Sequence, residues 1–473
     1  MNFDFSLITT ELATVILGLT TFVLGLVLPS NSRKGLGNFA LLGLIIVLGI
    51  AIASWSNQGE MLGGMYLVDQ YSIFFKILFL VAAILVIFGS LRYVNDQVGN
   101  HFEYYSTVIF ATLGMIVMAS AGDFITLYLG LELMTISFVV LVAFRTFDGK
   151  SLEAGMKYIL LAGMSSAVIL YGLSLVYGAT GTIIISEVAQ RVSEGSPLLT
   201  VGLVMLVAGL GFKVSAVPFH MWSPDVYEGA PTPVTSFLAV GSKAASFAVL
   251  VRLFVGGLPG IHEQWAMLIA VLAAVSMVVG NLVAIPQTNI KRLLAYSSIA
   301  QAGYILVGLV TATEAGIKGV MFYAFLYVFA TVGAFTVVAA VYNKIQSDEI
   351  ADYAGLVQRA PLAATVMLVC LLSMAGIPPL AGFVGKFYLF KTVVEGYMWL
   401  VYLGLIMSMV SVYYYLRVVL VMFRDEPADH TPLEMGSSVN ITLLIALVAT
   451  LFLGIYPGPL AEVANIAAQS FFP

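Results

Sequence analysis

The sequence is poor in charge and in cysteine. Only 10% of its 473 residues are charged and 60% are hydrophobic, whereas an ordinary soluble domain carries about 25% charged residues. This imbalance excludes a water-soluble fold. The single cysteine, Cys370, lies in an apolar run, so this chain alone can build neither a disulfide framework nor a thiolate-bound iron–sulfur cluster. We therefore expect any redox chemistry to take place in other polypeptides.

Histidine and concentrated positive charge are also scarce. The four histidines lie near predicted helix ends, which disfavours a haem-carrying bundle: His101, His220, His262 and His430. The formal net charge is −5, and the absence of a basic stripe or tail argues against nucleic-acid binding. Acidic Asp4 and Glu11, rather than basic residues, precede or begin the first apolar run, so we expect no cleavable signal peptide.

Long apolar runs are what the sequence has in abundance. A spanning helix needs about 20 mostly apolar residues, and such runs follow one another over almost the whole chain. We predict an all-α polytopic membrane protein of about 14 transmembrane helices. The expected spans lie near 12–28, 39–55, 71–89, 105–118, 124–144, 153–177, 198–217, 234–254, 265–285, 293–309, 320–341, 361–394, 398–423 and 439–456. Between 180 and 197, charged and apolar residues alternate at helical spacing, which predicts a short surface helix.

Positive charge is distributed unevenly among the predicted loops. If the N-terminus faces outward, the outer loops hold only Arg191 and Lys318. The inner loops then hold the other loop cations: Arg33, Lys34, Arg92, Arg145, Lys150, Lys291, Arg292, Lys344, Arg359 and Arg424. This asymmetry follows the positive-inside rule. It predicts that both termini lie on the outer side of the membrane.

Few charges fall inside the predicted spans, and an ion at the bilayer centre costs roughly 2.5–3.5 kcal/mol on insertion scales. Glu132 is the only carboxylate placed clearly mid-span, and Lys213 and Lys243 each lie well inside an apolar run, which favours a functional role. Lys157 lies one turn after Glu153, so a local ion pair and a transport role both stay open. Four further cations lie close enough to helix ends to reach lipid headgroups or to pair locally: Lys76, Arg252, Lys391 and Arg417.

Prolines interrupt two of the spans. Pro218 follows Lys213, and Pro378 and Pro379 precede Lys386. Proline removes a backbone donor and clashes with the preceding turn, and the carbonyls freed in a membrane must face protein or water. Two such breaks at corresponding places are typical of inverted repeats with a site near the midplane. Because burial favours the neutral form of a lysine and a nearby carboxylate favours the charged form, a row of these groups can relay protons.

Five segments of the sequence are similar to one known family. They are GFKVSAVPFHMWSPDVYEGAPTPVTSFLAVGSKAA over 211–245, LYLGLELMTIS around Glu132, SLEAGMKYILLAG around Lys157, QTNIKRLLAYSSIAQAGY around Lys291, and GIPPLAGFVGKFY around Lys386. These segments resemble the antiporter-like, proton-pumping subunits of respiratory complex I, the NADH-quinone oxidoreductase also called NDH-1, and among them the subunit N (subunit 2) family. The similarity runs over most of the chain.

The resemblance implies an architecture and a setting. It implies two inverted five-helix repeats with helices 7 and 12 broken, divided into helices 1–3 (residues 1–104), a first repeat of helices 4–8 (105–260), a second of helices 9–13 (261–425) and helix 14 (426–473). It also implies a translocase subunit of the bacterial inner membrane that couples electron transfer from NADH to quinone with proton pumping. Subunits M, K and J and membrane lipids would be its partners. Flavin, iron–sulfur clusters and quinone would lie in other subunits, with no cofactor or metal in this chain.

The resemblance also implies roles for the charged residues. Glu132 and Lys213 would be the coupling pair, and Lys157 a bridging or modulating cation. Lys243 would be the central relay lysine and Lys386 the terminal lysine, facing the outer exit. Proton transfer would be driven electrostatically by quinone reduction in a neighbouring part of the complex.

Two positions complicate that relay. His220 lies beside the break in helix 7, where it could load protons or only make a helix-end hydrogen bond. Relatives often carry histidine where this sequence has Gln301, and a glutamine cannot titrate. Proton passage there would need water or the neighbouring hydroxyls of Ser297, Ser298 and Tyr304, which can orient a water chain without holding charge.

Other interpretations stay open at this point. A subunit of a multisubunit Na⁺/H⁺ antiporter shares the Glu–Lys pair and the broken helices, although the PDVYEGAPTPV segment and a lysine rather than glutamate at position 386 disfavour it. The same subunit could also serve a complex fed by ferredoxin, F420H2 or a plastoquinone-linked donor. A purely structural subunit would use its charges only to lock helices together. In that case conservative changes at Lys213 or Lys243 should weaken assembly and leave the proton yield per electron unaltered.

Overall fold

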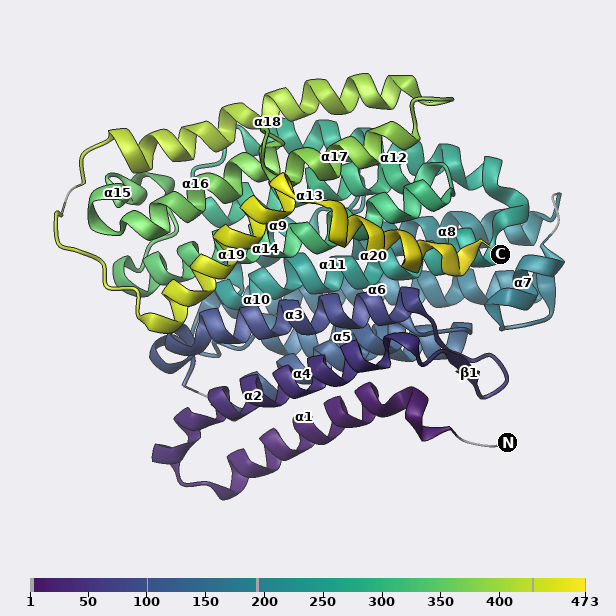
Figure 1. Cartoon of the computed structure of the whole chain (residues 1–473), viewed down its shortest axis with the longest axis horizontal. Coiled ribbons are helices and arrows are strands. Elements are labelled where there is room, and N and C mark those ends of the chain that lie inside the picture. Colours follow the sequence, from purple (N-terminus) through teal and green to yellow (C-terminus); the bar gives the residue numbers. More distant parts are fainter. Residues whose placement is uncertain (1–3, 100, 193–194, 428, 473) are drawn as a thin grey trace.

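Helices make up most of the computed structural model, which describes residues 4–99, 101–192, 195–427 and 429–472 (Figure 1). The α-helices are α1 (Thr9–Val27), α2 (Leu36–Ala53), α3 (Gln70–Tyr93), α4 (His101–Ala119), α5 (Phe124–Val142), α6 (Gly149–Thr180), α7 (Ile185–Arg191), α8 (Pro197–Lys213), α9 (Trp222–Gly229), α10 (Thr232–Phe237), α11 (Lys243–Leu250), α12 (His262–Ala284), α13 (Ile290–Val310), α14 (Glu314–Ile345), α15 (Leu356–Arg359), α16 (Pro361–Ala375), α17 (Ala381–Thr392), α18 (Met398–Arg424), α19 (Ser437–Ile455) and α20 (Gly458–Ala468). Short 3₁₀ or π-helical turns are η1 (Phe5–Ile8), η2 (Ser30–Gly35), η3 (Ser54–Ser56), η4 (Val94–Val98), η5 (Leu238–Ser242), η6 (Val251–Gly257), η7 (Pro259–Ile261), η8 (Ile350–Tyr353) and η9 (Gln469–Phe471).

The number of membrane crossings agrees with the sequence. Within the described residues, 12 helices are long and apolar enough to span a bilayer, and one of them is the continuous rod Thr232–Gly257 formed by α10, η5, α11 and η6. Two further crossings are broken into the pairs α8 with α9 and α16 with α17. The prediction of about 14 spans, with the seventh and twelfth broken, is therefore confirmed. The helix α7 confirms the short helix expected between 180 and 197.

The helix starts follow from side chains that cap free backbone N–H groups. Asp69 and Ser72 form a capping box at the start of α3, and Asp123 accepts from the N–H groups of Ile125 and Thr126 at the start of α5. Asn289 accepts from the N–H groups of Lys291 and Arg292 at the start of α13. These polar residues stand between apolar runs, so each loop fixes where the next span begins.

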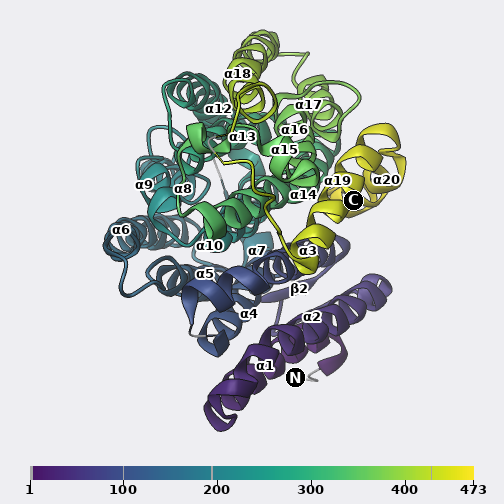
Figure 2. The same cartoon turned by 90° about the vertical axis from the view of Figure 1, so that its left-hand side faces the viewer.

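The centre of the bundle is almost entirely shielded from its surroundings. In α13, in α14 and in the rod Thr232–Gly257, 94% of the most apolar 18-residue stretch is buried, whereas the value is 39% for the α1, α6 and α18 spans. Figures 1 and 2 both show α1 and α2 at one edge of the bundle. Polar groups on α13, on α14 and on the rod Thr232–Gly257 therefore lie away from lipid. A proton relay requires such a shielded position.

The sequence did not predict two small elements. One is the hairpin of β1 (Gly59–Met61) and β2 (Tyr66–Val68), which pair antiparallel with Gly59 opposite Val68. The other is α20, which follows the last span and packs against α14 and α3. Asn465 of α20 donates to Glu314 at the start of α14 at 2.8 Å. Helix α20 therefore covers the N-terminal end of α14.

The chain ends and the proposed divisions can also be located. Figure 1 shows both labelled ends on the same side of the bundle, as an even number of crossings requires. That this side is the outer one stays a prediction. The predicted boundary at 104 falls inside α4, the one at 260 falls in η7, and the one at 425 directly follows α18. The division into these units stays a prediction as well.

Candidate functional site

A line of buried polar side chains follows one face of α13 through the middle of the bundle. Ser297, Ser298, Gln301 and Tyr304 are each no more than 1% exposed, and the spacing of Ser297, Gln301 and Tyr304 places them on one side of a helix. Lys243, the first residue of α11, donates to the carbonyl oxygen of Ser298 at 3.0 Å and also to its hydroxyl. The expected hydroxyls therefore lie directly at the central lysine.

Lys386 lies at the other end of this line, where α16 breaks. Gly376 ends α16 in the left-handed conformation, with φ of 87°, which glycine adopts at little cost. The Lys386 Nζ atom donates to the freed carbonyl oxygen of Ala375 at 3.1 Å and to the Ser408 hydroxyl at 2.6 Å. It also lies 4.1 Å from the centre of the Tyr304 ring. The broken helix thus supplies one of the ligands of the buried ammonium group.

Gln301 is held firmly between the two lysines. Its amide Nε2 donates to the carbonyl oxygen of Met374 at 2.8 Å, and its Oε1 accepts from the Tyr323 hydroxyl at 2.5 Å. Nε2 also lies 3.4 Å from the hydroxyl of Tyr415, which bonds to Ser297. Gln301 therefore closes the end of α16, beside the carbonyl that binds Lys386, and orders the surrounding tyrosines.

Glu132 and Lys213, the coupling pair implied by the resemblance, form no direct ion pair in the described residues, and their coupling stays a prediction. Lys213 is 2% exposed and donates to the hydroxyls of Thr135 at 2.9 Å and Ser166 at 3.4 Å. Glu132 lies one turn before Thr135 on α5, and its Oε1 is buried without a hydrogen-bond partner in the described residues. Lys213 therefore binds α5 through Thr135, one turn from Glu132 on the same helix.

Lys157 lies outside the buried line. Its side chain is 41% exposed and forms ion pairs with Glu153 at 2.8 Å and with Asp225 at 2.7 Å. These residues line an open cavity of about 170 Å³ together with Lys150, Glu228 and Arg292. Of the two possibilities left open by the sequence, the local ion pair is present, and a modulating role stays a prediction.

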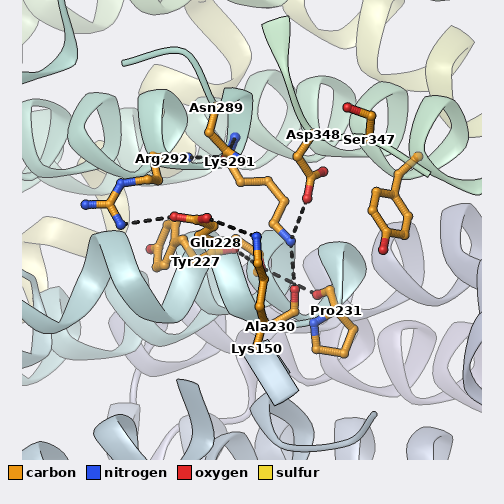
Figure 3. A network of polar contacts seen from close by, with 12 residues as sticks. Lys150, Tyr227, Glu228, Ala230, Pro231, Asn289, Lys291, Arg292, Ser347 and Asp348 are labelled. Carbon is orange, nitrogen blue, oxygen red and sulfur yellow. Dashed lines mark hydrogen bonds and ion pairs between the residues drawn. The ribbon is translucent and has the colours of Figure 1, made fainter. Parts of the chain in front are cut away.

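A network of ion pairs connects this cavity to α13 (Figure 3). Arg292 bonds to Glu228 at 3.0 Å, and Lys150 approaches the same carboxylate at 3.5 Å. Lys291, only 4% exposed, donates to the carbonyl oxygen of Ala230 at 3.0 Å and pairs with Asp348 at 3.4 Å. From the sequence, Lys291 was expected to be an ordinary loop cation. The signal for a buried position was its place two residues after the cap of α13 and two turns before Ser298.

Three of the cations expected to reach headgroups or to pair locally bind distant parts of the chain instead. Lys76 is 1% exposed and pairs with Glu11 at 2.6 Å. Arg252 forms two 2.7 Å bonds to Asp69, and Arg417 donates to backbone carbonyls, one of them at 2.7 Å. The expectation that they reach headgroups or pair locally is therefore wrong for Lys76 and Arg252, which are buried against carboxylates distant in sequence, and Arg417 is held by the distant Ile285 and Gln287 carbonyls.

His220 occupies the connection between α8 and α9. It is 8% exposed, and its Nδ1 is buried without a hydrogen-bond partner in the described part of the chain. The break itself is held by Ser276, whose hydroxyl accepts from the Val217 N–H at 2.9 Å. Proton loading by His220 stays a prediction. Among the described residues, no three His, Cys, Asp or Glu side chains gather in a way that could hold a metal ion.

Comparisons with known proteins agree on one family. Residues 121–412 match the family described as NADH:quinone oxidoreductase/Mrp antiporter, TM. A curated relative from Desulforamulus reducens, NADH-quinone oxidoreductase subunit N, is 80% identical over 100% of this chain and 99% of its own length. A chain of respiratory complex I from Thermus thermophilus is 35% identical, with a TM-score of 0.82 over 96% of this chain and 99% of that one. A chain of the Mrp complex from Dietzia sp. has a TM-score of 0.89 at 20% identity, covering 99% of this chain and 98% of its own, which shows a shared fold alone.

Proposed function

Because this chain belongs to the NADH-quinone oxidoreductase subunit N family, we propose that protons pass through it along Lys213, Lys243 and Lys386, with Glu132 controlling the first of them. It is a multi-pass protein of the bacterial inner membrane and one of several membrane-arm subunits of its complex. Electron transfer from NADH to quinone would drive the relay from a neighbouring subunit.

One observation carries the proposal: the three relay lysines are buried without a carboxylate in ion-pair contact among the described residues. Their partners are hydroxyls and backbone carbonyls. A buried charge without a counter-ion is costly, and such a group shifts readily between its charged and neutral forms. Lys243 and Lys386 lie at the two ends of the polar line on α13, and Lys213 with Thr135 and Ser166 would form the entry to that path.

The same chain also contains buried cations that do contact a carboxylate. This contrast disfavours the purely structural alternative for the relay lysines. Lys76 and Arg252 each contact a carboxylate at 2.6–2.7 Å, as cations that lock helices together should. If the three relay lysines were also locks, comparable partners would be expected beside them. The contrast supports two separate roles for buried cations in this protein.

Several finer points belong to the proposal. Lys157 would modulate the first lysine from the open cavity, and His220 would load protons beside the break. Subunits M, K and J would be the neighbours, and the flavin, clusters and quinone would lie in other subunits, with no redox centre in this chain. Both termini would lie on the outer side, so that Lys386 faces the outer exit. The likeness to an Mrp chain at 20% identity does not favour a sodium-exchanging role over this one.

The relay is tested by replacing Lys213 and Lys243 with methionine, and Glu132 with glutamine, in the native complex. We expect each variant complex to assemble on a native gel and its proton pumping in membrane vesicles to fall at least about tenfold, because loss of a single essential group commonly costs several kcal/mol. Quinone reductase activity should fall as well where pumping and electron transfer are coupled. Lys34→Met, which removes an exposed loop cation, is the matched control and should pump normally.

The outcome separates the two interpretations. Assembled complexes with normal turnover and normal pumping would eliminate the relay. Failed assembly of the Lys213 and Lys243 variants, with an unchanged proton yield per electron in whatever complex remains, would instead place these two lysines with the structural cations.

A further inference from the structure

The end of α16 leaves backbone carbonyls that other parts of the chain must bind. The last four carbonyls of an α-helix have no partner within it. Two of those in α16 accept from backbone N–H groups of the turn that follows, at 2.9–3.1 Å. The carbonyl of Met374 accepts from Gln301 of α13 at 2.8 Å, and that of Ala375 accepts from Lys386 of α17 at 3.1 Å. Two side chains from other helices therefore bind consecutive carbonyls at the break.

Lys386 has one backbone carbonyl and one hydroxyl as hydrogen-bond acceptors, Ala375 at 3.1 Å and Ser408 at 2.6 Å. Lys243 has the same set, since it binds both the carbonyl oxygen and the hydroxyl of Ser298. A hydroxyl can also donate to a neutral amine, whereas a carbonyl can only accept. Because a hydrogen bond from a charged donor is roughly twice as strong as a neutral one, each added carbonyl would favour the charged lysine.

The amide of Gln301 keeps a second carbonyl away from Lys386. Because the Met374 carbonyl only accepts, the nitrogen of the amide must face it, and the amide oxygen accepts from the Tyr323 hydroxyl at 2.5 Å. Gln301 is 1% exposed, so both bonds are shielded from solvent. The third N–H group of the ammonium has only the face of the Tyr304 ring in the described residues, 4.1 Å from its centre. Without Gln301, the buried Met374 carbonyl would lack a donor, which is costly, and would bind this N–H group.

We propose that Gln301 is a positioning residue for proton release at Lys386: by binding the Met374 carbonyl, its amide leaves the ammonium group a single backbone ligand. In the release step, one N–H bond of Lys386 breaks, its proton passes to water, and the nitrogen keeps the electron pair, to which the Ser408 hydroxyl can donate. This inference rests on the proposed relay. It gives a glutamine that cannot titrate a task at the last lysine, without requiring the glutamine to carry the proton.

The test compares two replacements of Gln301 in the native complex. Gln301→Met removes the donor at nearly the same side-chain length, whereas the neutral imidazole in Gln301→His keeps one donor and one acceptor. We expect Gln301→Met to assemble and to pump about tenfold more slowly, within the range of one hydrogen bond to a charged group. Gln301→His should stay within about twofold of the parent, because both bonds can form again. Gln287→Met is the matched control and should pump normally, because Gln287 donates at 3.0 Å to the Val283 carbonyl near the end of α12, which binds no relay lysine.

The pH profile of pumping separates this role from a purely structural one. A proton that is held too tightly is released more readily as the pH rises, so the deficit of Gln301→Met should shrink between about pH 6.5 and about pH 8, whereas a distorted break would lose as much at either pH. Lysine, tyrosine and cysteine side chains ordinarily titrate at about pH 8.5 or above, so the other titratable groups on the surrounding helices should keep their charge. They are Tyr304 of α13, Lys318 and Tyr323 of α14, Cys370 of α16, Tyr388 and Lys391 of α17, and Tyr415 of α18.

The outcomes are distinct. Normal pumping by Gln301→Met, a deficit that does not change with pH, or an equal loss in Gln301→His would overturn the inference. If Gln301→Met does not assemble, Gln301→Met combined with Tyr323→Phe takes its place, because it removes the hydroxyl left without an acceptor and still frees the Met374 carbonyl. The same pH-dependent deficit is expected, and normal pumping would overturn the inference. Lys386→Met serves as the reference: if that variant pumps normally, the proposed function itself fails, whereas its failure to pump beside an unaffected Gln301→Met removes only the role of Gln301.

Discussion

Replacing Lys76 with methionine measures what a buried ion pair contributes to holding α1 against the rest of the bundle. The side chains of Lys76 and Glu11 are 2% and 10% exposed, and their contact is 2.6 Å. Tyr66 of β2 donates to the same carboxylate oxygen at 2.6 Å, and the second oxygen has no hydrogen-bond partner in the described residues. Three elements, α1, α3 and the hairpin, therefore meet at one carboxylate.

The expected cost follows from what each change leaves behind. Lys76→Met strands a buried carboxylate, and breaking a buried pair in this way costs about 3–5 kcal/mol. Since about 1.4 kcal/mol is tenfold in an equilibrium, the equilibrium constant for docking of α1 should fall by about two to three and a half powers of ten. Replacing all three groups, as Lys76→Met with Glu11→Leu and Tyr66→Phe, removes every unpaired polar atom. Such isosteric replacement is often neutral or stabilising.

The assay is assembly on a native gel, combined with limited proteolysis of the connection between α1 and α2. We expect Lys76→Met to assemble poorly and to be cut quickly, and the triple variant to approach the parent protein. Lys34→Met, an exposed cation in that connection, serves as the matched control. The reasoning is refuted if the single variant is as stable as the parent, or if the triple variant is the least stable of the series.

Two further changes test the broken helix and the first lysine. A Cβ added at Gly382 would overlap the carbonyl oxygen of Ser373, so Gly382→Ala should force α16 and α17 apart and lower both assembly and pumping. Gly49→Ala on α2, where a Cβ meets nothing within 4 Å, should leave native-gel assembly and pumping unchanged. Thr135→Val removes the 2.9 Å partner of Lys213 and should lower pumping about threefold to tenfold, the range of one hydrogen bond, without loss of assembly. Unaltered pumping in vesicles would show that Thr135 does not hold the lysine.

The sequence predicted the spans well because each is specified locally. A capping residue such as Asp69 or Asn289 followed by an apolar run of sufficient length predicts a membrane crossing, and proline marks where two crossings break. The hairpin was missed although Gly63 and Gly64, both with positive φ, stand between its two strands. Their turn signal is short and lies between much stronger apolar runs.

The site was predictable only in its charged members. Lys213, Lys243 and Lys386 stand out because an ion in an apolar run demands an explanation. Ser408 does not stand out, since a single uncharged polar residue is common in a spanning helix. Its importance comes from the contact of α18 with Lys386 of α17, and no local pattern encodes that contact. For the same reason Lys76 and Arg252 were expected to reach headgroups or to pair locally, although their carboxylate partners lie on distant elements.

The separation of Glu132 from Lys213 bears on how the relay could be driven. Two unit charges about 4 Å apart interact by about 4 kcal/mol at an effective dielectric of 20, and doubling the separation halves that energy. Opening or closing the pair is therefore worth about 2 kcal/mol, more than a factor of ten in an equilibrium. In the structure Lys213 is held by Thr135 and Ser166 with the pair open. A hydrogen bond to a charged group is itself worth about 1.5–3 kcal/mol, so losing the Thr135 and Ser166 bonds would offset the Coulombic gain, and the open and closed arrangements would lie close in free energy.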